Sequence, residues 1–80
     1  MSDAFGRRMR AYRKLKRLTQ AELADQLGVS IAIVGTLERG TRVPSRQMIT
    51  HVAAALQVSE VELLGGLTVK EVVEANPGGF

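Results

Sequence analysis

Two short amphipathic segments, separated by only three residues, occupy the centre of the chain over residues 18–40. Thr19, followed three positions later by Glu22, forms a capping-box pattern that predicts the start of a helix. Gly28 ends this helix, because helices commonly close on a residue that tolerates a positive φ angle. Ser30 then caps a second helix of similar length. So short a connection makes the two helices pack at a steep angle and leaves one outer face of the second helix free.

Capping residues and apolar periodicity also organise the rest of the chain. Apolar side chains recur at spacings of four and three over residues 3–17, which predicts a helix with one buried face. Ser45 and Ser59 predict the starts of a fourth and a fifth helix. A further capping box predicts a short helix over residues 68–75, after which Asn and Pro break the pattern.

The pattern as a whole predicts an all-α fold, because no segment alternates strictly as a half-buried strand does. We expect a domain of five helices over residues 1–66, followed over residues 67–80 by a short sixth helix and tail. This last segment either packs on its own domain or pairs with a second copy of the chain. The apolar positions predict a core of Phe5, Met9, Tyr12, Leu18, Leu23, Ala24, Leu27, Val29, Val34, Leu37, Ile49, Val52, Ala53, Leu56, Val58 and Leu63.

Size and composition narrow the function classes. Eighty residues suffice for one domain with one small core, and they leave no room for a separate small-molecule domain. The chain has no cysteine and no cluster of His and carboxylate side chains, so we expect no disulfide, metal or other cofactor. His51 is the single histidine and falls beside an inward position, where a surface role is favoured over catalysis. An enzyme is therefore not predicted, and the absence of a long apolar run predicts a cytoplasmic protein without a membrane segment.

Charge is distributed unevenly along the chain. Residues 1–17 contain seven basic side chains and one acidic side chain, whereas residues 47–80 contain one lysine and four glutamates. The stretch between them is balanced. A polarised chain of this kind favours a polyanionic partner for its basic part, although charge alone is equally consistent with a solvated basic helix.

Four stretches together resemble the Cro and phage-repressor family, also described as lambda repressor-like, of helix-turn-helix regulators. They are FGRRMRAYRK, LTQAELADQLGVS, LERGTRVPS and VAAALQVSEVELL, in the family's order over residues 5–64. The resemblance implies a compact five-helix domain that binds double-stranded operator DNA. It also implies a symmetric homodimer on a palindromic site, with the third helix in the major groove.

The resemblance assigns roles to individual residues. Gln20 matches a glutamine that holds a backbone phosphate together with the helix N-terminus, a position that favours anions. Arg13 and Glu38 match an internal salt bridge. Where the family usually has a glycine, Arg17 closes the first helix, so this turn must avoid a positive φ angle or tolerate it at some cost. The predicted phosphate contacts are Arg17, Gln20, Arg39, Arg42 and Arg46.

The outer face of the predicted reading helix is poor in hydrogen-bonding groups. Its base-reading candidates are Ser30, Ile31, Ala32, Gly35 and Thr36, with Ile33 at the edge and Arg39 at the end. Ile31 and Ala32 suit thymine methyl groups, which leaves much of the specificity to DNA shape. Gly35 is expected to let the helix backbone approach the DNA closely. The alternative is a protein–protein interaction module that uses the apolar face of Ile31, Ala32 and Ile33, together with Leu15.

Overall fold

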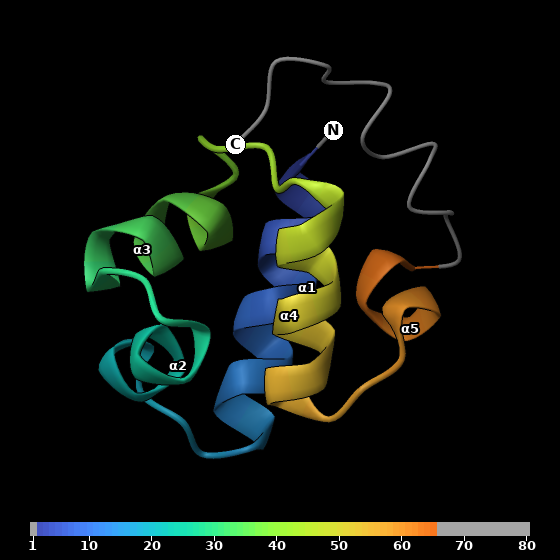
Figure 1. Cartoon of the computed structure of the whole chain (residues 1–80). Coiled ribbons are helices and arrows are strands. Elements are labelled where there is room, and N and C mark those ends of the chain that lie inside the picture. Colours follow the sequence, from blue (N-terminus) through green and yellow to red (C-terminus); the bar gives the residue numbers. More distant parts are fainter. Residues whose placement is uncertain (1, 66–80) are drawn as a thin grey trace.

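Five α-helices and no strand make up residues 2–65, the part of the chain that the computed structural model describes (Figure 1). The predicted all-helical, five-helix fold is confirmed. The predicted sixth helix and the tail after it lie outside the described residues. The helices are α1 (Ser2–Leu15), α2 (Gln20–Leu27), α3 (Ile31–Arg39), α4 (Arg46–Leu56) and α5 (Glu60–Leu64).

Hydroxyl side chains begin four of the five helices. Thr19, Ser30, Ser45 and Ser59 have extended backbones, and each hydroxyl accepts a hydrogen bond from the backbone N–H three residues later. These bonds satisfy N–H groups that have no partner within the helix. Complete capping boxes form at Thr19, as predicted, and at Ser59. The starts of α2 to α5 therefore follow from local sequence.

Left-handed residues end the helices, and two of them are not glycine. Gly28, Gly40 and Gly65 adopt positive φ angles, as do Arg17, with φ of 62°, and Gln57. At the end of α1, the Leu18 N–H donates to the Arg13 carbonyl at 3.0 Å, which closes the turn in the way a glycine usually does. The turn thus tolerates Arg17 in a conformation that L-residues adopt with some strain.

The core lies between α1 and the other helices. In Figure 1, α4 crosses in front of α1, with α2 and α3 to one side and α5 to the other. Eleven of the predicted core residues are buried, and the other five, Tyr12, Leu18, Leu27, Val29 and Val58, pack against the core while partly exposed. Met48 and Leu64 are also buried but were not predicted. Their neighbours Ile49 and Leu63 are buried too, so these helices bury a wider face than a single stripe.

Gly6 brings α1 and α3 into close contact. A Cβ atom at this position would lie 2.5 Å from the Glu38 carbonyl oxygen and 2.6 Å from that of Leu37. Both atoms belong to the backbone at the end of α3, so they cannot move aside as a side chain can. The absence of a side chain at Gly6 therefore sets how closely the first helix approaches the end of the third.

Candidate nucleic-acid interface

A buried ion pair joins the end of α1 to the end of α3. The Arg13 Nε donates to Glu38 Oε2 at 2.6 Å and the Nη2 donates to Glu38 Oε1 at 3.1 Å. The two side chains are only 10% and 2% exposed. Arg13 Nη1 also donates to the Leu18 carbonyl at 2.9 Å, which ties the pair to the chain just before α2. The pair implied by the resemblance is present, and it holds three helices in register.

Gln20 joins the same network at the N-terminus of α2. Its Nε2 donates to Glu38 Oε1 at 3.1 Å, and the side chain is partly exposed. The network therefore fixes Gln20 beside the first turn of a helix, where the backbone N–H groups attract anions. The amide keeps a second N–H and its carbonyl oxygen for an outside partner. The position suits the predicted phosphate contact.

The outer face of α3 begins with exposed, mostly apolar residues. Ile31 is 52% exposed, and Ala32 is exposed beside it. The Ser30 hydroxyl caps the helix by accepting from the Ile33 N–H at 3.3 Å. Ile33 packs against the core while partly exposed, whereas Leu15, the fourth member of the apolar face in the alternative prediction, is 72% exposed at the end of α1. On α3, exposed apolar groups are limited to the first turn.

Gly35 does not lie open on this face, contrary to the sequence prediction. The residue is buried, and the groups nearest to where its Cβ would stand belong to Arg39. The guanidinium of Arg39 thus covers the glycine. The expected close approach of the helix backbone to DNA at Gly35 therefore requires the Arg39 side chain to leave the place that it occupies here.

Thr36 is held by two internal hydrogen bonds. Its hydroxyl donates to the Ile33 carbonyl at 2.7 Å and accepts from Arg42 Nε at 3.2 Å. The hydroxyl proton is therefore occupied within the protein, and the side chain is only partly exposed. In this arrangement Thr36 orients Arg42, which comes from the loop after α3. The sequence predicted a base contact at Thr36 and did not predict its link to Arg42.

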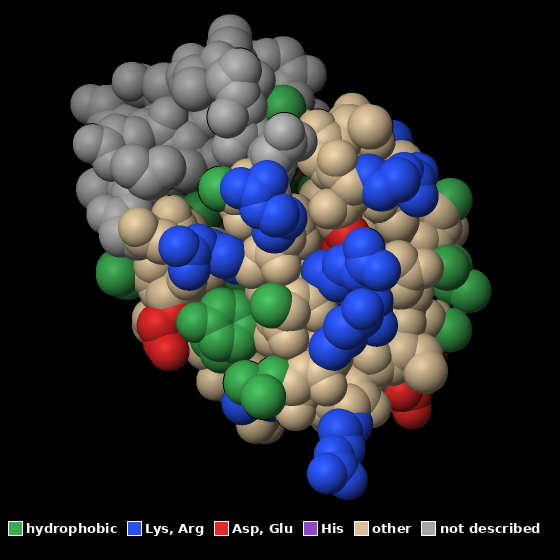
Figure 2. All heavy atoms as spheres, turned by 180° about the vertical axis from the view of Figure 1, so that it is seen from behind, with side chains coloured by type: hydrophobic (Ala, Val, Ile, Leu, Met, Phe, Trp, Pro, Cys, Tyr) green, Lys and Arg blue, Asp and Glu red, His purple; other side chains and the backbone are tan. Residues whose placement is uncertain are grey.

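Exposed basic side chains precede α2, begin α4 and line part of α1. Arg46 is exposed at the first position of α4, and Arg17 is exposed in the turn before α2. Seen from behind, the molecule shows Lys and Arg side chains gathered over the face to which α1 contributes (Figure 2). The exposed cations of α1 include Arg7, Arg10 and Lys14. The basic segment found in the sequence thus forms an extended positive surface on a helix that packs against α3.

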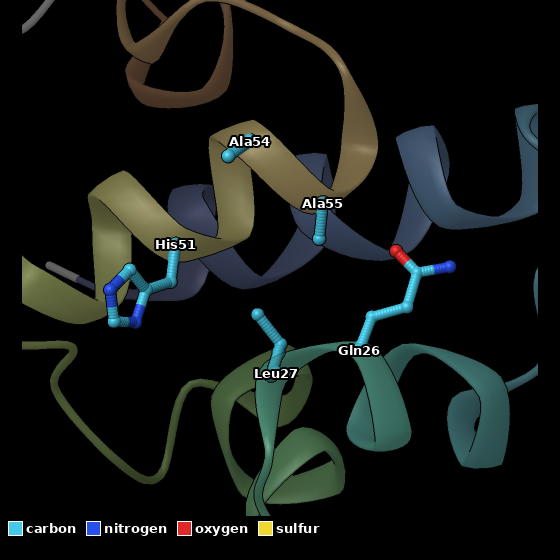
Figure 3. Close-up of a pocket in the computed structure, with 5 residues that line it drawn as sticks. All are labelled: Gln26, Leu27, His51, Ala54 and Ala55. Atoms are coloured by element: carbon cyan, nitrogen blue, oxygen red, sulfur yellow. The ribbon is translucent and has the colours of Figure 1, made fainter.

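The single histidine of the chain lies at a hollow in the surface. A shallow hollow of about 410 Å³ lies between α2 and α4, lined by Gln26, Leu27, His51, Ala54 and Ala55 (Figure 3). His51 is exposed at its rim, as predicted. Within residues 2–65, no three His, Asp or Glu side chains are grouped so that they could hold a metal ion. No helix of this range is long and apolar enough to cross a bilayer.

Two features of the site were missed at the level of sequence. One is the placement of the Arg39 guanidinium over Gly35, and the other is the Thr36–Arg42 hydrogen bond. The placement of Arg39 over Gly35 could have been predicted from their spacing, because residues four apart lie on one face of a helix. The Thr36–Arg42 hydrogen bond joins a helix to a loop, and no local sequence pattern specifies the path of that loop.

The fold and the arrangement of α2 and α3 define a class of protein. The chain belongs to the helix-turn-helix domain family, whose model matches residues 4–64. It is 47% identical over 62 residues to the uncharacterized HTH-type transcriptional regulator YazB of Bacillus subtilis. The matched region covers 78% of this chain and 90% of that protein. The expected class, helix-turn-helix regulators, is thereby confirmed.

Solved structures of regulators share this fold. The restriction-modification controller protein C.AhdI from Aeromonas hydrophila aligns with a TM-score of 0.74 and 39% identity, over 78% of this chain and 94% of that one. The P22 c2 repressor, solved in complex with a synthetic operator, aligns with a TM-score of 0.72 and 35% identity, over 79% and 96% of the two chains. The likeness to the P22 c2 repressor agrees with the resemblance of the sequence to the Cro and phage-repressor family.

Proposed function

We propose that this chain is a transcriptional regulator that binds double-stranded operator DNA with α3 in the major groove. The observation that carries the proposal is the position of α3. One side of this helix is fixed to α1 through Glu38 and the core, while its first turn is exposed and two arginines lie against it, Arg39 beside Gly35 and Arg42 at Thr36. A single exposed helix on a rigid domain is the arrangement that major-groove readers use. The likeness to a repressor solved with its operator supports the same reading.

Phosphate contacts supply most of the affinity in this proposal. The proposed phosphate contacts are Arg17 in the turn before α2, Gln20 at the start of α2, Arg42 in the loop after α3 and Arg46 at the start of α4. Neutralising phosphates releases counterions, so binding weakens steeply as salt rises. Each phosphate contact contributes a slope of about −0.9 in a plot of log affinity against log salt concentration.

A homodimer on a palindromic operator completes the proposal. Two reading helices about 34 Å apart would meet successive major grooves on one side of the duplex. Two-fold symmetry in the protein then requires a matching symmetry in the DNA.

Selection of bound duplexes from a random pool, at two salt concentrations, tests the proposal. We expect recovered sites with two related half-sites and an affinity that falls steeply with salt. The Arg46→Ala variant should bind every duplex more weakly and reduce the salt slope by about 1. The matched control is Arg8→Ala, since Arg8 lies against Gly65 at the end of α5. Binding that does not depend on salt, or no recovered duplex, would favour a protein partner for Ile31 and Ala32.

A further inference from the structure

Arg39 and Gly35 form a pair one turn apart on the outer face of α3. The Arg39 Nη1 lies 2.9 Å from where a Cβ atom of residue 35 would stand, with Cζ at 3.7 Å and Nη2 at 3.9 Å. Long side chains in a helix point back toward its N-terminus, so the guanidinium comes to rest over the preceding turn. It occupies the space that any side chain other than hydrogen would fill at position 35.

Unlike Arg13 and Arg42, Arg39 has no side-chain partner among the described residues. Arg13 is fully engaged by Glu38 and Leu18, and Arg42 donates to Thr36. No hydrogen bond or ion pair joins Arg39 to another residue of the range 2–65. Its side chain is nevertheless exposed and lies along the middle of α3 rather than extending from the helix end. The donors of the guanidinium are therefore available on the part of α3 that would face a groove.

We infer that Arg39 reads a guanine in the operator and that Gly35 is the positioning residue that makes room for it. The inference rests on the proposed function. An arginine fork that donates to guanine O6 and N7 is the commonest specific contact in the major groove. Of the other candidates, Ile31 and Ala32 have no polar group, the Ser30 hydroxyl caps the helix by accepting from the Ile33 N–H, and the Thr36 hydroxyl proton is held by the Ile33 carbonyl. This role replaces the phosphate contact that the sequence predicted for Arg39.

The inference explains why residue 35 is a glycine within a helix. Glycine is among the least favourable residues within a helix, so neutral drift toward alanine would strengthen α3. In the Gly35→Ala variant, the new methyl group meets only the flexible end of Arg39. The helix backbone has no need to move, and the variant should fold while its arginine is displaced. A thermal unfolding curve checks this, with a midpoint equal to or above that of the wild type.

A double-mutant cycle tests the coupling between the two residues. Affinities are measured for the wild type, Gly35→Ala, Arg39→Ala and the double variant. The probes are the duplex recovered from the random pool and derivatives in which each G·C pair in turn is changed to A·T. We expect the wild type to lose about tenfold in affinity at one G·C pair of each half-site. This preference should shrink in Gly35→Ala and disappear in Arg39→Ala, and the double variant should match Arg39→Ala.

The matched control is a second double-mutant cycle, in which Gly35→Ala is combined with Arg46→Ala in place of Arg39→Ala. Arg46 is exposed at the start of α4, outside the group that lies over Gly35. Gly35→Ala should therefore reduce the guanine preference by the same factor with or without Arg46. Independent effects at Gly35 and Arg39 would overturn the inference. So would a uniform loss of affinity across all duplexes in Arg39→Ala, since that result indicates a phosphate contact.

The outcome also separates this inference from the proposed function. If the wild-type chain recovers no duplex from the pool, the proposed function is wrong and the role of Arg39 falls with it. If the wild type recovers a site and Gly35→Ala keeps the full guanine preference, only the pairing of Gly35 with Arg39 is wrong. Retention of the preference by Arg39→Ala would assign base reading to another side chain of α3.

Discussion

Removing the Arg13 side chain should destabilise the domain far more than truncation of an exposed charged residue. The Arg13→Ala variant deletes two hydrogen bonds to Glu38 and one to the Leu18 carbonyl. The Glu38 carboxylate, which is 2% exposed, would then keep only the Gln20 amide as a donor. A buried charge left without its partner is far more costly than a broken surface pair.

The expected loss is large compared with the stability of so small a domain. Breaking a buried ion pair by deleting one partner destabilises a protein by about 3–5 kcal/mol. At about 0.05–0.15 kcal/mol per residue, a domain of this size has about 3–10 kcal/mol of total stability. The Arg13→Ala variant should therefore unfold at a much lower urea concentration, with a sizeable unfolded fraction even in buffer.

Urea unfolding followed by circular dichroism measures this loss, with two comparison variants. Arg10→Ala is the matched control, because Arg10 is an exposed arginine on the same helix, and it should change stability by less than about 0.5 kcal/mol. The pair Arg13→Met with Glu38→Leu removes both charges and fills the space with apolar atoms. This double variant should recover most of the stability, because no buried charge is left unpaired.

One result would refute the reasoning about this pair. Exposed ion pairs contribute about 0–1 kcal/mol. If Arg13→Ala loses no more than this amount, the carboxylate of Glu38 must reach water or other donors once Arg13 is removed. The ion pair would then position the helices without governing the stability of the domain.

Three further predictions concern backbone fit and helix capping. Gly6→Ala should destabilise the domain by about 2 kcal/mol in urea unfolding, because the new methyl group meets two fixed carbonyl oxygens. Gly35→Ala is the matched control, since its new methyl group meets a flexible side chain. Equal stability of the two variants would contradict the close approach at Gly6. Arg17→Gly should stabilise the domain by about 1 kcal/mol, since the positive φ angle of Arg17 suits glycine. The same variant should bind all duplexes more weakly in a titration at constant salt. Unchanged binding would remove Arg17 from the phosphate contacts. The backbone N–H of Ser59, then its hydroxyl and the charge of Lys16, hold the pKa of the Glu62 carboxyl below its ordinary value. A lowered pKa in the folded state adds stability above the unfolded pKa, and this contribution is lost as the pH falls below about 4.5. The urea midpoint of Glu62→Gln should therefore depend less on pH between 3 and 6 than that of the wild type, and parallel curves would contradict the link.

Local sequence determined where the helices begin and end and which faces they bury. The serine and threonine caps predicted the starts of α2 to α5, because a hydroxyl satisfies N–H groups only three residues away. The apolar periodicity predicted most of the core for the same reason, since one helix face repeats at a fixed spacing. The family resemblance covered almost the same residues and placed Arg13 opposite Glu38, a pairing that periodicity alone does not contain.

Tertiary structure decided which side chains of the reading helix are available to a partner. Gly35 is covered, Thr36 is engaged by Arg42, and Arg39 lies along the helix without a partner among residues 2–65. Each outcome depends on where a flexible side chain or a loop comes to rest against another element. Helical spacing fixes the direction in which a Cα–Cβ bond points, but it does not fix where the end of a long arginine settles. The close approach of α1 to α3 at Gly6 is of the same kind, because it joins backbone atoms more than thirty residues apart in the chain.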